Sequence, residues 1–523
     1  MGDIMLRLMI AVFVSLLAST ISTAQITTSQ YDNMRTGANV TEKILTPRNV
    51  NSKTFGKLGA FGVDGAVYAQ PLYVPGLEIP GKGRHNVLYV ATEHDSVYAF
   101  DADHPGQPPL WHVNFLDPAK DVRTVRAADV QCPFIVPEVG ITSTPVIDIA
   151  TGTLYVLART SVAHSFSSNE YPQHLHALAI TTGVEKFGGP KLIQASVPGR
   201  GDGTSAGRVE FNGLRENPRA SLLLVNENVI LTWASSCDVN PYHGWIISYD
   251  ARSLAQKGVL NVTPDGSEGG IWASDTGPAA DSDGNIFVPT ANGTFDAASG
   301  GRNYGNTILK LYGNSLAIRD FYTPSNQARL SDEDADLGSS GPTLLPDQAQ
   351  PHRHILIQPG KDGLIYVVDR DQMGKYRAHD DAIIQKFKAG DGGYGAVAYW
   401  NGHVYFAGSD DSLRSYRVSA TGLKEESRSA KKFENPGATP AVSANGNKDA
   451  IVWAISTRTW NGEDKPAVLY AFDATNVSQP IYTSDEVPAR DRAALATRFV
   501  IPLVVNGRVY FGARGEVEVY GLK

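Results

Sequence analysis

One short pattern recurs along this chain and limits what it can fold into. Two strand-like segments joined by a tight polar turn return about every 55 to 60 residues, from near the start of the sequence to its end. Residues 86–92 with 96–101 form the first copy, and residues 508–512 with 516–521 form the last. The copies between them are residues 152–158 with 175–180, 229–234 with 245–250, 285–290 with 307–311, 354–359 with 364–369, 403–408 with 412–418 and 450–456 with 467–473. Units that repeat at this spacing stack on one another to bury their apolar faces, and the period is typical of a β-propeller.

A short apolar segment precedes each copy. Residues 70–74, 144–148 and 500–504 are examples, rich in small residues and proline. Because these segments are apolar on both faces, we expect them to be buried on both sides as the innermost strands around a central axis. Counting inner segments and hairpins predicts an all-β protein, an eight-bladed β-propeller of four-stranded antiparallel blades.

The last blade is one strand short at the C-terminus. Residues 54–61 have the character of an outer strand and run directly into the first inner segment. If they complete the last blade, the ring closes without an open sheet edge. The sequence therefore predicts a single propeller domain over residues 54–523 and an N-terminal segment over residues 25–53. The alternative for residues 54–61 is an exposed N-terminal arm.

Residues 1–24 have the pattern of a secretory signal peptide. Arg7 precedes an apolar run over residues 8–18, and a small-x-small cleavage site ends at Ala24. The apolar run is roughly half as long as a membrane-spanning helix requires, which favours export over a membrane anchor. We therefore expect a periplasmic or extracellular protein without a membrane span.

Cys132 and Cys237 are the two cysteines of the chain. Cys132 precedes the second inner segment, and Cys237 lies in the hairpin loop of the third blade, so the repeat places both at one rim. An exported protein with neighbouring cysteines is expected to form a disulfide. Two buried thiols are the alternative.

Charge argues against a nucleic-acid partner. The formal net charge is -8 and no basic stripe occurs along the chain. The partners that remain are a small-molecule or carbohydrate ligand at the central rim, or another protein.

The blade sequences resemble a known family. Ala99, Asp101 and Trp111, and residues 179–183 with Phe187, are similar to the Ala-x-Asp-x-x-Thr-Gly-x-x-x-Trp signature of pyrroloquinoline-quinone (PQQ) propellers. That family includes quinoprotein alcohol dehydrogenases and their non-enzymatic relatives. The resemblance covers nearly the whole chain and implies the propeller fold, but such blades serve enzymes and scaffolds alike.

Three residues resemble cofactor-binding positions of the family's enzymes. Trp272 matches the tryptophan that floors the quinone, and Asn292 matches the asparagine that binds calcium. Lys361 matches the lysine that touches the quinone oxygens. The resemblance implies PQQ and calcium as cofactors. The repeat places all three residues at one rim, and an indole, an amide oxygen and an ammonium suit a planar ring, a hard cation and quinone oxygens respectively.

The chain departs from the family at the catalytic carboxylate. The enzymes carry an aspartate in a Gly-Asp-Asn run before the third strand of the tryptophan's blade, and the matching residues 300–307 contain no carboxylate. The family's disulfide between adjacent cysteines is also absent. Asp296, Asp275 and Glu138 are candidates to replace the aspartate as general base, and the catalytic residue stays unassigned.

Structural roles compete with these assignments. Trp272 could be a structural aromatic, because buried tryptophans are common packing anchors, and Asn292 and Lys361 suit polar hairpin turns. Three functions therefore remain open. The first is a PQQ-dependent dehydrogenase of an alcohol or sugar. The second is a non-catalytic ligand- or protein-binding propeller that binds no cofactor. The third is a polysaccharide lyase or hydrolase, because residues such as Tyr242 and His243 occur in the hairpins.

Overall fold

The computed structural model describes residues 24–165, 168–348, 351–458 and 464–523. The predicted signal peptide lies outside these residues except for Ala24. Within the described ranges, no helix combines the length and the apolar character that a bilayer crossing requires.

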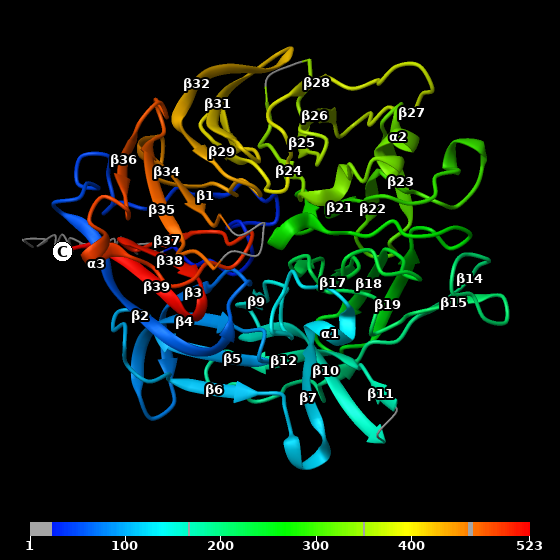
Figure 1. Ribbon diagram of the computed structural model, residues 1–523, viewed down its shortest axis with the longest axis horizontal. Coiled ribbons are helices and arrows are strands. Elements are labelled where there is room, and N and C mark those ends of the chain that lie inside the picture. The colour runs from blue at the N-terminus through cyan, green and yellow to red at the C-terminus, as the bar shows by residue number, and fades with distance from the viewer. Residues whose placement is uncertain (1–23, 166–167, 349–350, 459–463) are drawn as a thin grey trace, which may run out of the picture.

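The chain forms a ring of twisted antiparallel sheets around a central axis (Figure 1). The innermost strands are β3 (Leu72–Ile79), β9 (Val146–Asp148), β16 (Leu223–Val225), β20 (Ala279–Ala280), β24 (Thr343–Leu344), β29 (Ala398–Trp400), β33 (Ala441–Asn445) and β37 (Leu503–Val505). The second strands are β4 (Gly83–Ala91), β10 (Thr153–Ser165), β17 (Asn228–Trp233), β21 (Asn285–Pro289), β25 (Ile355–Pro359), β30 (His403–Ala407), β34 (Lys448–Ser456) and β38 (Arg508–Gly512). The third strands are β5 (Ser96–Asp101), β12 (Gln173–Ala179), β18 (Trp245–Asp250), β22 (Ile308–Tyr312), β26 (Leu364–Asp369), β31 (Asp411–Ser419), β35 (Val468–Asp473) and β39 (Arg514–Leu522). The outer strands are β6 (Trp111–Asn114), β13 (Lys191–Leu192), β19 (Gln256–Asn261), β23 (Ile318–Thr323), β28 (Gln385–Lys388), β32 (Gly422–Phe433), β36 (Pro480–Thr483) and β2 (Phe55–Ala66).

The prediction of eight four-stranded antiparallel blades needs correction in number and in pairing. Seven blades each take their four ring strands from one continuous stretch of chain, whereas the remaining sheet is a composite of β2 with β37, β38 and β39. Three sheets also carry additional strands, and two of these pair in parallel, which the prediction excluded. The additions are β1 (Ala38–Asn39) on β33, β27 (Lys375–Tyr376) on β23, and β7 (Val122–Arg126), β8 (Glu138–Val139) and β11 (Ser168–Glu170) on the sheet of β10. Strands this short leave no periodic signal in the sequence. Their pairing depends on which exposed sheet edge lies beside them.

The two ends of the chain close the ring. β2 pairs antiparallel with β39, from Phe55 opposite Leu522 to Ala66 opposite Arg514. This pairing confirms the expectation that residues 54–61 complete the last blade, and it excludes an exposed arm. It leaves β39, the third strand of that sheet, without an open edge.

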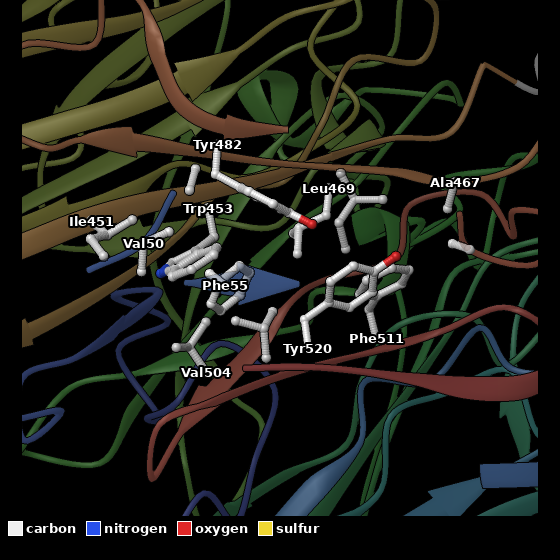
Figure 2. Packing of buried hydrophobic residues seen from close by; sticks show 14 of the residues in the cluster. Val50, Phe55, Ile451, Trp453, Ala467, Leu469, Tyr482, Val504, Phe511 and Tyr520 are labelled. Atoms are coloured by element: carbon white, nitrogen blue, oxygen red, sulfur yellow. The ribbon is translucent and has the colours of Figure 1, made fainter. Parts of the chain in front are cut away.

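The core lies between neighbouring sheets. Figure 2 shows one such cluster, in which Phe55 of β2 packs among aromatic side chains of the next blade. The ring centroid of Phe55 lies 4.9 Å from that of Tyr482 in an edge-on arrangement and 5.5 Å from that of Trp453. Offset and edge-on contacts of this kind add to the stability gained from area burial.

The N-terminal segment forms backbone hydrogen bonds with the inner strands around the ring. Residues 26–37 accept bonds from the backbone amides of Tyr73, Ile147, Ala280, Leu344, Tyr399 and Val442. These amides belong to inner strands that are far apart in the sequence, and Asn39 continues the series by donating to the Val504 carbonyl. Residues 26–39 therefore tie the inner strands to one another.

Short helices and one hairpin occupy the connections. They are α1 (Ala127–Val130), α2 (Gln327–Asp332), α3 (Pro488–Asp491), the 3-10 turns η1 (Pro118–Lys120), η2 (Ala273–Asp275), η3 (Ala297–Ser299) and η4 (Leu337–Ser339), and the hairpin of β14 (Ser196–Pro198) and β15 (Arg208–Glu210). Two of these turns, η2 and η4, lie just before inner strands and shape the site described next.

Candidate functional site

A cavity of about 180 Å³ opens among loops that precede inner strands or join second to third strands. It is lined by Phe134, Arg219, Cys237, Asp238, Trp272, Ser274, Asp334, Asp336, Ser339, Lys361, Tyr394, Arg498 and Phe499. Two of the three residues expected to bind a cofactor, Trp272 and Lys361, belong to this lining. The cavity is therefore the candidate site.

Trp272 enters the cavity wall from the connection before β20. The two residues that follow it, Ala273 and Ser274, have positive φ angles of 46° and 34°. Non-glycine residues in this conformation are strained and persist where the surrounding structure imposes it, often at functional sites. The Ser274 hydroxyl donates to the Ser339 carbonyl at 2.6 Å, which fixes this turn against the next blade.

Lys361 enters from the hairpin between β25 and β26. Its Nζ lies 2.7 Å from Oδ2 of Asp334 and 3.5 Å from Oδ2 of Asp336. Burial opposes the charge, but the carboxylates of Asp336 and Asp334 outweigh it and raise the pKa of Lys361. The ammonium is therefore held charged at the cavity wall.

Asp334 and Asp336 supply the carboxylates that sequence reasoning missed. They lie between α2 and η4, in the connection that leads into β24, so they occupy the same place in their blade that Trp272 occupies in the preceding one. Asp334 is exposed, whereas Asp336 is only 6% exposed. Asp336 accepts a hydrogen bond from the backbone N–H of Asn292 at 3.0 Å. Burial raises the pKa of Asp336 to about 6. The acidic run over residues 332–336, followed by an inner strand, was the signal that could have found them.

Asn292 stands behind these carboxylates, outside the cavity lining. Its Nδ2 donates to Oδ1 of Asp334 at 2.9 Å, while its Oδ1 is buried without a hydrogen-bond partner. Asp238 completes the acidic side of the cavity, where it accepts a hydrogen bond from the Tyr242 hydroxyl at 2.7 Å and where burial raises its pKa. An unpartnered amide oxygen beside carboxylates is a donor set of the type that a hard cation takes. No group of three or more His, Cys, Asp or Glu residues that would hold a metal occurs in the described parts of the chain.

Cys132 and Cys237 form a disulfide at the edge of the cavity. Their sulfur atoms lie 2.08 Å apart and their Cα atoms 5.4 Å apart, although 105 residues separate them in the sequence. The bond fastens the connection between the first two blades, which carries Phe134, to the hairpin loop of the third blade. The site therefore has a disulfide, but from distant and not adjacent cysteines.

Two arginines form a cationic side of the cavity that the sequence analysis did not single out. The Arg219 guanidinium lies 4.6 Å from the centroid of the Phe499 ring, and the Arg498 guanidinium lies 4.4 Å from that of Phe134. Distances of this size are those of cation–π contacts.

The other candidate carboxylates lie elsewhere. Asp296 accepts hydrogen bonds from the amide and the side chain of Asn303, at 2.8 and 2.6 Å, and so braces its own loop. Glu138 pairs with His94 at 3.0 Å. Neither is part of the cavity lining, and the side chain of Asp275 is outside the described part of the chain.

The hairpin residues behind the carbohydrate hypothesis are buried. Tyr242 is 1% exposed and His243 is 2% exposed. His243 hydrogen-bonds the Asp202 carbonyl at 2.8 Å and the Thr263 hydroxyl at 3.0 Å, so both of its ring nitrogens are occupied within the protein.

Comparison with known proteins gives the fold. No protein-family model and no curated protein sequence matches this chain. Among solved structures, the quinohemoprotein alcohol dehydrogenase ADHIIG from Pseudomonas putida HK5 is similar over 95% of this chain and 80% of its own, with 14% identity and a TM-score of 0.60. A europium-containing methanol dehydrogenase is similar over 95% of this chain and 98% of its own, with 12% identity and a TM-score of 0.56. The chain therefore shares the β-propeller fold of quinoprotein dehydrogenases, which confirms the resemblance at the level of architecture.

Proposed function

We propose that this protein is a quinone-dependent dehydrogenase of an alcohol or sugar. The observation that carries the proposal is the convergence of an indole, a charged lysine and two carboxylates on one cavity, from Trp272, Lys361, Asp334 and Asp336. These groups come from two successive blades, and a packed ring needs no such combination at its rim.

The residues fit the cofactors that the resemblance implies. Trp272 offers a flat face for a planar ring, and the Lys361 ammonium offers charge to quinone oxygens. The unpartnered Oδ1 of Asn292 offers an oxygen ligand to a calcium ion. When bound, the ortho-quinone supplies the oxidant that takes up two electrons and two protons from an alcohol.

The remaining chemistry belongs to this chain's own residues. Asp336, with a pKa of about 6, is ionised at neutral pH and basic enough to accept the hydroxyl proton of a substrate. Lys361 holds a positive charge beside that carboxylate. Phe134, Phe499 and Tyr394 give the cavity an aromatic wall.

A non-catalytic binding propeller is the second candidate. It is favoured by the ion pairs of Lys361 with Asp334 and Asp336, because paired charges also occur in sites with no chemistry to perform. The two candidates differ in whether the cavity binds a quinone.

Titration of the purified protein with PQQ, with and without calcium, tests the proposal by absorption spectroscopy and calorimetry. Trp272→Ala and Lys361→Ala are each expected to weaken binding by about 1–3 kcal/mol, Trp272→Phe to retain most of it, and Lys43→Ala, an exposed control, to change nothing. Asn292→Ala is expected to abolish the calcium effect. No heat and no spectral change at about 1 mM quinone would overturn the dehydrogenase and favour the binding propeller.

A further inference from the structure

The cavity has a cationic side that the roles proposed above leave unused. Arg219 lies before the inner strand β16 and Arg498 before the inner strand β37, so loops of two separate blades bring them to the same cavity. Their side chains are largely buried, with 6% and 7% of each residue exposed. The cavity thus has guanidinium groups in its lining as well as the carboxylates of Asp238, Asp334 and Asp336.

Arg219 forms no close salt bridge with any described residue, although the buried Glu93 carboxylate interacts with it electrostatically. Its Nη2 is buried without a hydrogen-bond partner among the described residues. Its guanidinium lies against the ring of Phe499. A buried guanidinium is costly unless it is paired, and its planar fork of donors matches a carboxylate. An unpartnered arginine in a cavity wall therefore indicates an anionic ligand.

The surroundings of Arg498 point in the same direction. Burial lowers the pKa of Arg498, and the like charges of Arg219 and Arg514 lower it further, against an opposing effect of Tyr68. An anion bound between Arg219 and Arg498 would relieve this repulsion. Aromatic side chains, Phe134, Phe499, Tyr394 and Trp272, complete a wall suited to a partly apolar ligand.

Resting on the proposed function, we propose that Arg219 and Arg498 bind the carboxylate of the substrate, which makes the substrate class a hydroxy acid and not a neutral alcohol. One side of the cavity then binds the acid group, and the carboxylates of Asp334 and Asp336 face the hydroxyl. A neutral alcohol would leave the guanidinium of Arg219 without a salt-bridge partner.

Binding of mandelate and of its neutral isostere mandelamide to the protein without quinone tests this inference. Calorimetry or tryptophan fluorescence is expected to show mandelate binding about tenfold or more tighter than mandelamide. Arg219→Met is expected to remove that preference, and Arg219→Lys to restore part of it. Arg377→Met, at an exposed arginine, is the matched control, and thermal melting confirms that each variant is folded.

Two results would overturn the inference. One is equal affinity for the acid and the amide in the folded wild-type protein. The other is that Arg219→Met weakens PQQ binding about tenfold or more while mandelate competes with PQQ, which would assign the arginines to the carboxylates of the cofactor. Because the mandelate titrations contain no quinone, a preference for the acid stands even if PQQ fails to bind, and the two proposals fail separately.

Discussion

Nζ of Lys361 lies 2.7 Å from Oδ2 of Asp334, a carboxylate whose side chain is 62% exposed. The same ammonium reaches the buried Asp336 at 3.5 Å. One lysine thus joins a carboxylate in contact with solvent to one shielded from it. Because Asp336 is shielded from solvent and Asp334 is not, we expect the two carboxylates to differ in function.

Asp336 is predicted to be the general base, and Asp334 a positioning residue for Lys361. If the protein oxidises alcohols, Asp336→Asn should lower kcat by about 10²–10⁴, because the amide cannot accept the substrate proton. Asp334→Asn is expected to lower it less. In the wild type, kcat/KM should rise with pH through about 6 and level off above it, as Asp336 ionises. Dye-coupled assays across this range measure the profile, and a flat profile would exclude Asp336 as the base.

Arg35 is predicted to be a main support of the ring. It is fully buried, and it donates to the carbonyls of Pro278 at 2.9 Å, Leu222 at 3.1 Å and Ser29 at 2.7 Å. Arg35→Met should lower the free energy of unfolding by about 3–5 kcal/mol, because these buried acceptors lose their donor. Urea denaturation measures the loss. Arg48→Met, at a side chain that is 88% exposed, is the control and should leave the midpoint unchanged.

Phe55 is predicted to carry much of the stability of ring closure. It is fully buried on β2 among Trp453, Tyr482 and Tyr520. Phe55→Ala should cost about 3–5 kcal/mol through lost burial and the cavity that it leaves. Leu58→Ala, on the same strand but 37% exposed, should cost much less. Similar melting temperatures for the two variants would contradict this role.

Glu93 is predicted to make stability fall as pH rises. It is buried, it accepts hydrogen bonds from the Gly140 amide at 2.7 Å and the Thr142 hydroxyl at 3.1 Å, and burial raises its pKa from 4.5 to about 7. Because the folded-state pKa is the higher one, the folded protein retains this proton between these two values while the unfolded chain releases it. The contribution of Glu93 to stability is therefore present below about pH 4.5 and is lost as pH rises to about 7.

Glu93→Gln removes this titration. The unfolding free energies of the variant and of wild type are measured at each pH. From acidic to neutral pH, their difference is expected to shift in favour of the variant by on the order of 2–3 kcal/mol. Burial also raises the pKa of Asp95, so part of the pH dependence of the unfolding free energy remains in both proteins. Glu333→Gln, at an exposed glutamate, is the control. A difference between Glu93→Gln and wild type that does not vary with pH would refute the assignment.

The repeat in the sequence determined the local architecture of this protein. Strand pairs such as β4 with β5, and the closure of β39 by β2, follow from apolar alternation and from the missing outer strand, because these signals are short-range. The positions of Trp272 and Lys361 within their repeats also predicted that they lie at one rim, and the same holds for Cys132 and Cys237. Equivalent positions of successive blades face the same rim, and the structure places the first two in one cavity and joins the other two by a disulfide.

The tertiary structure decided what the connections do. The acidic residues Asp334 and Asp336, the guanidinium of Arg219 and the contacts of residues 26–39 with the inner strands all lie in segments without periodicity. The parallel pairing of β1 and β27 escaped the expectation of antiparallel blades for the same reason. Apolar alternation specifies which residues form strands, whereas the position of a loop side chain depends on the blades that pack around it, and that information is spread over the whole ring.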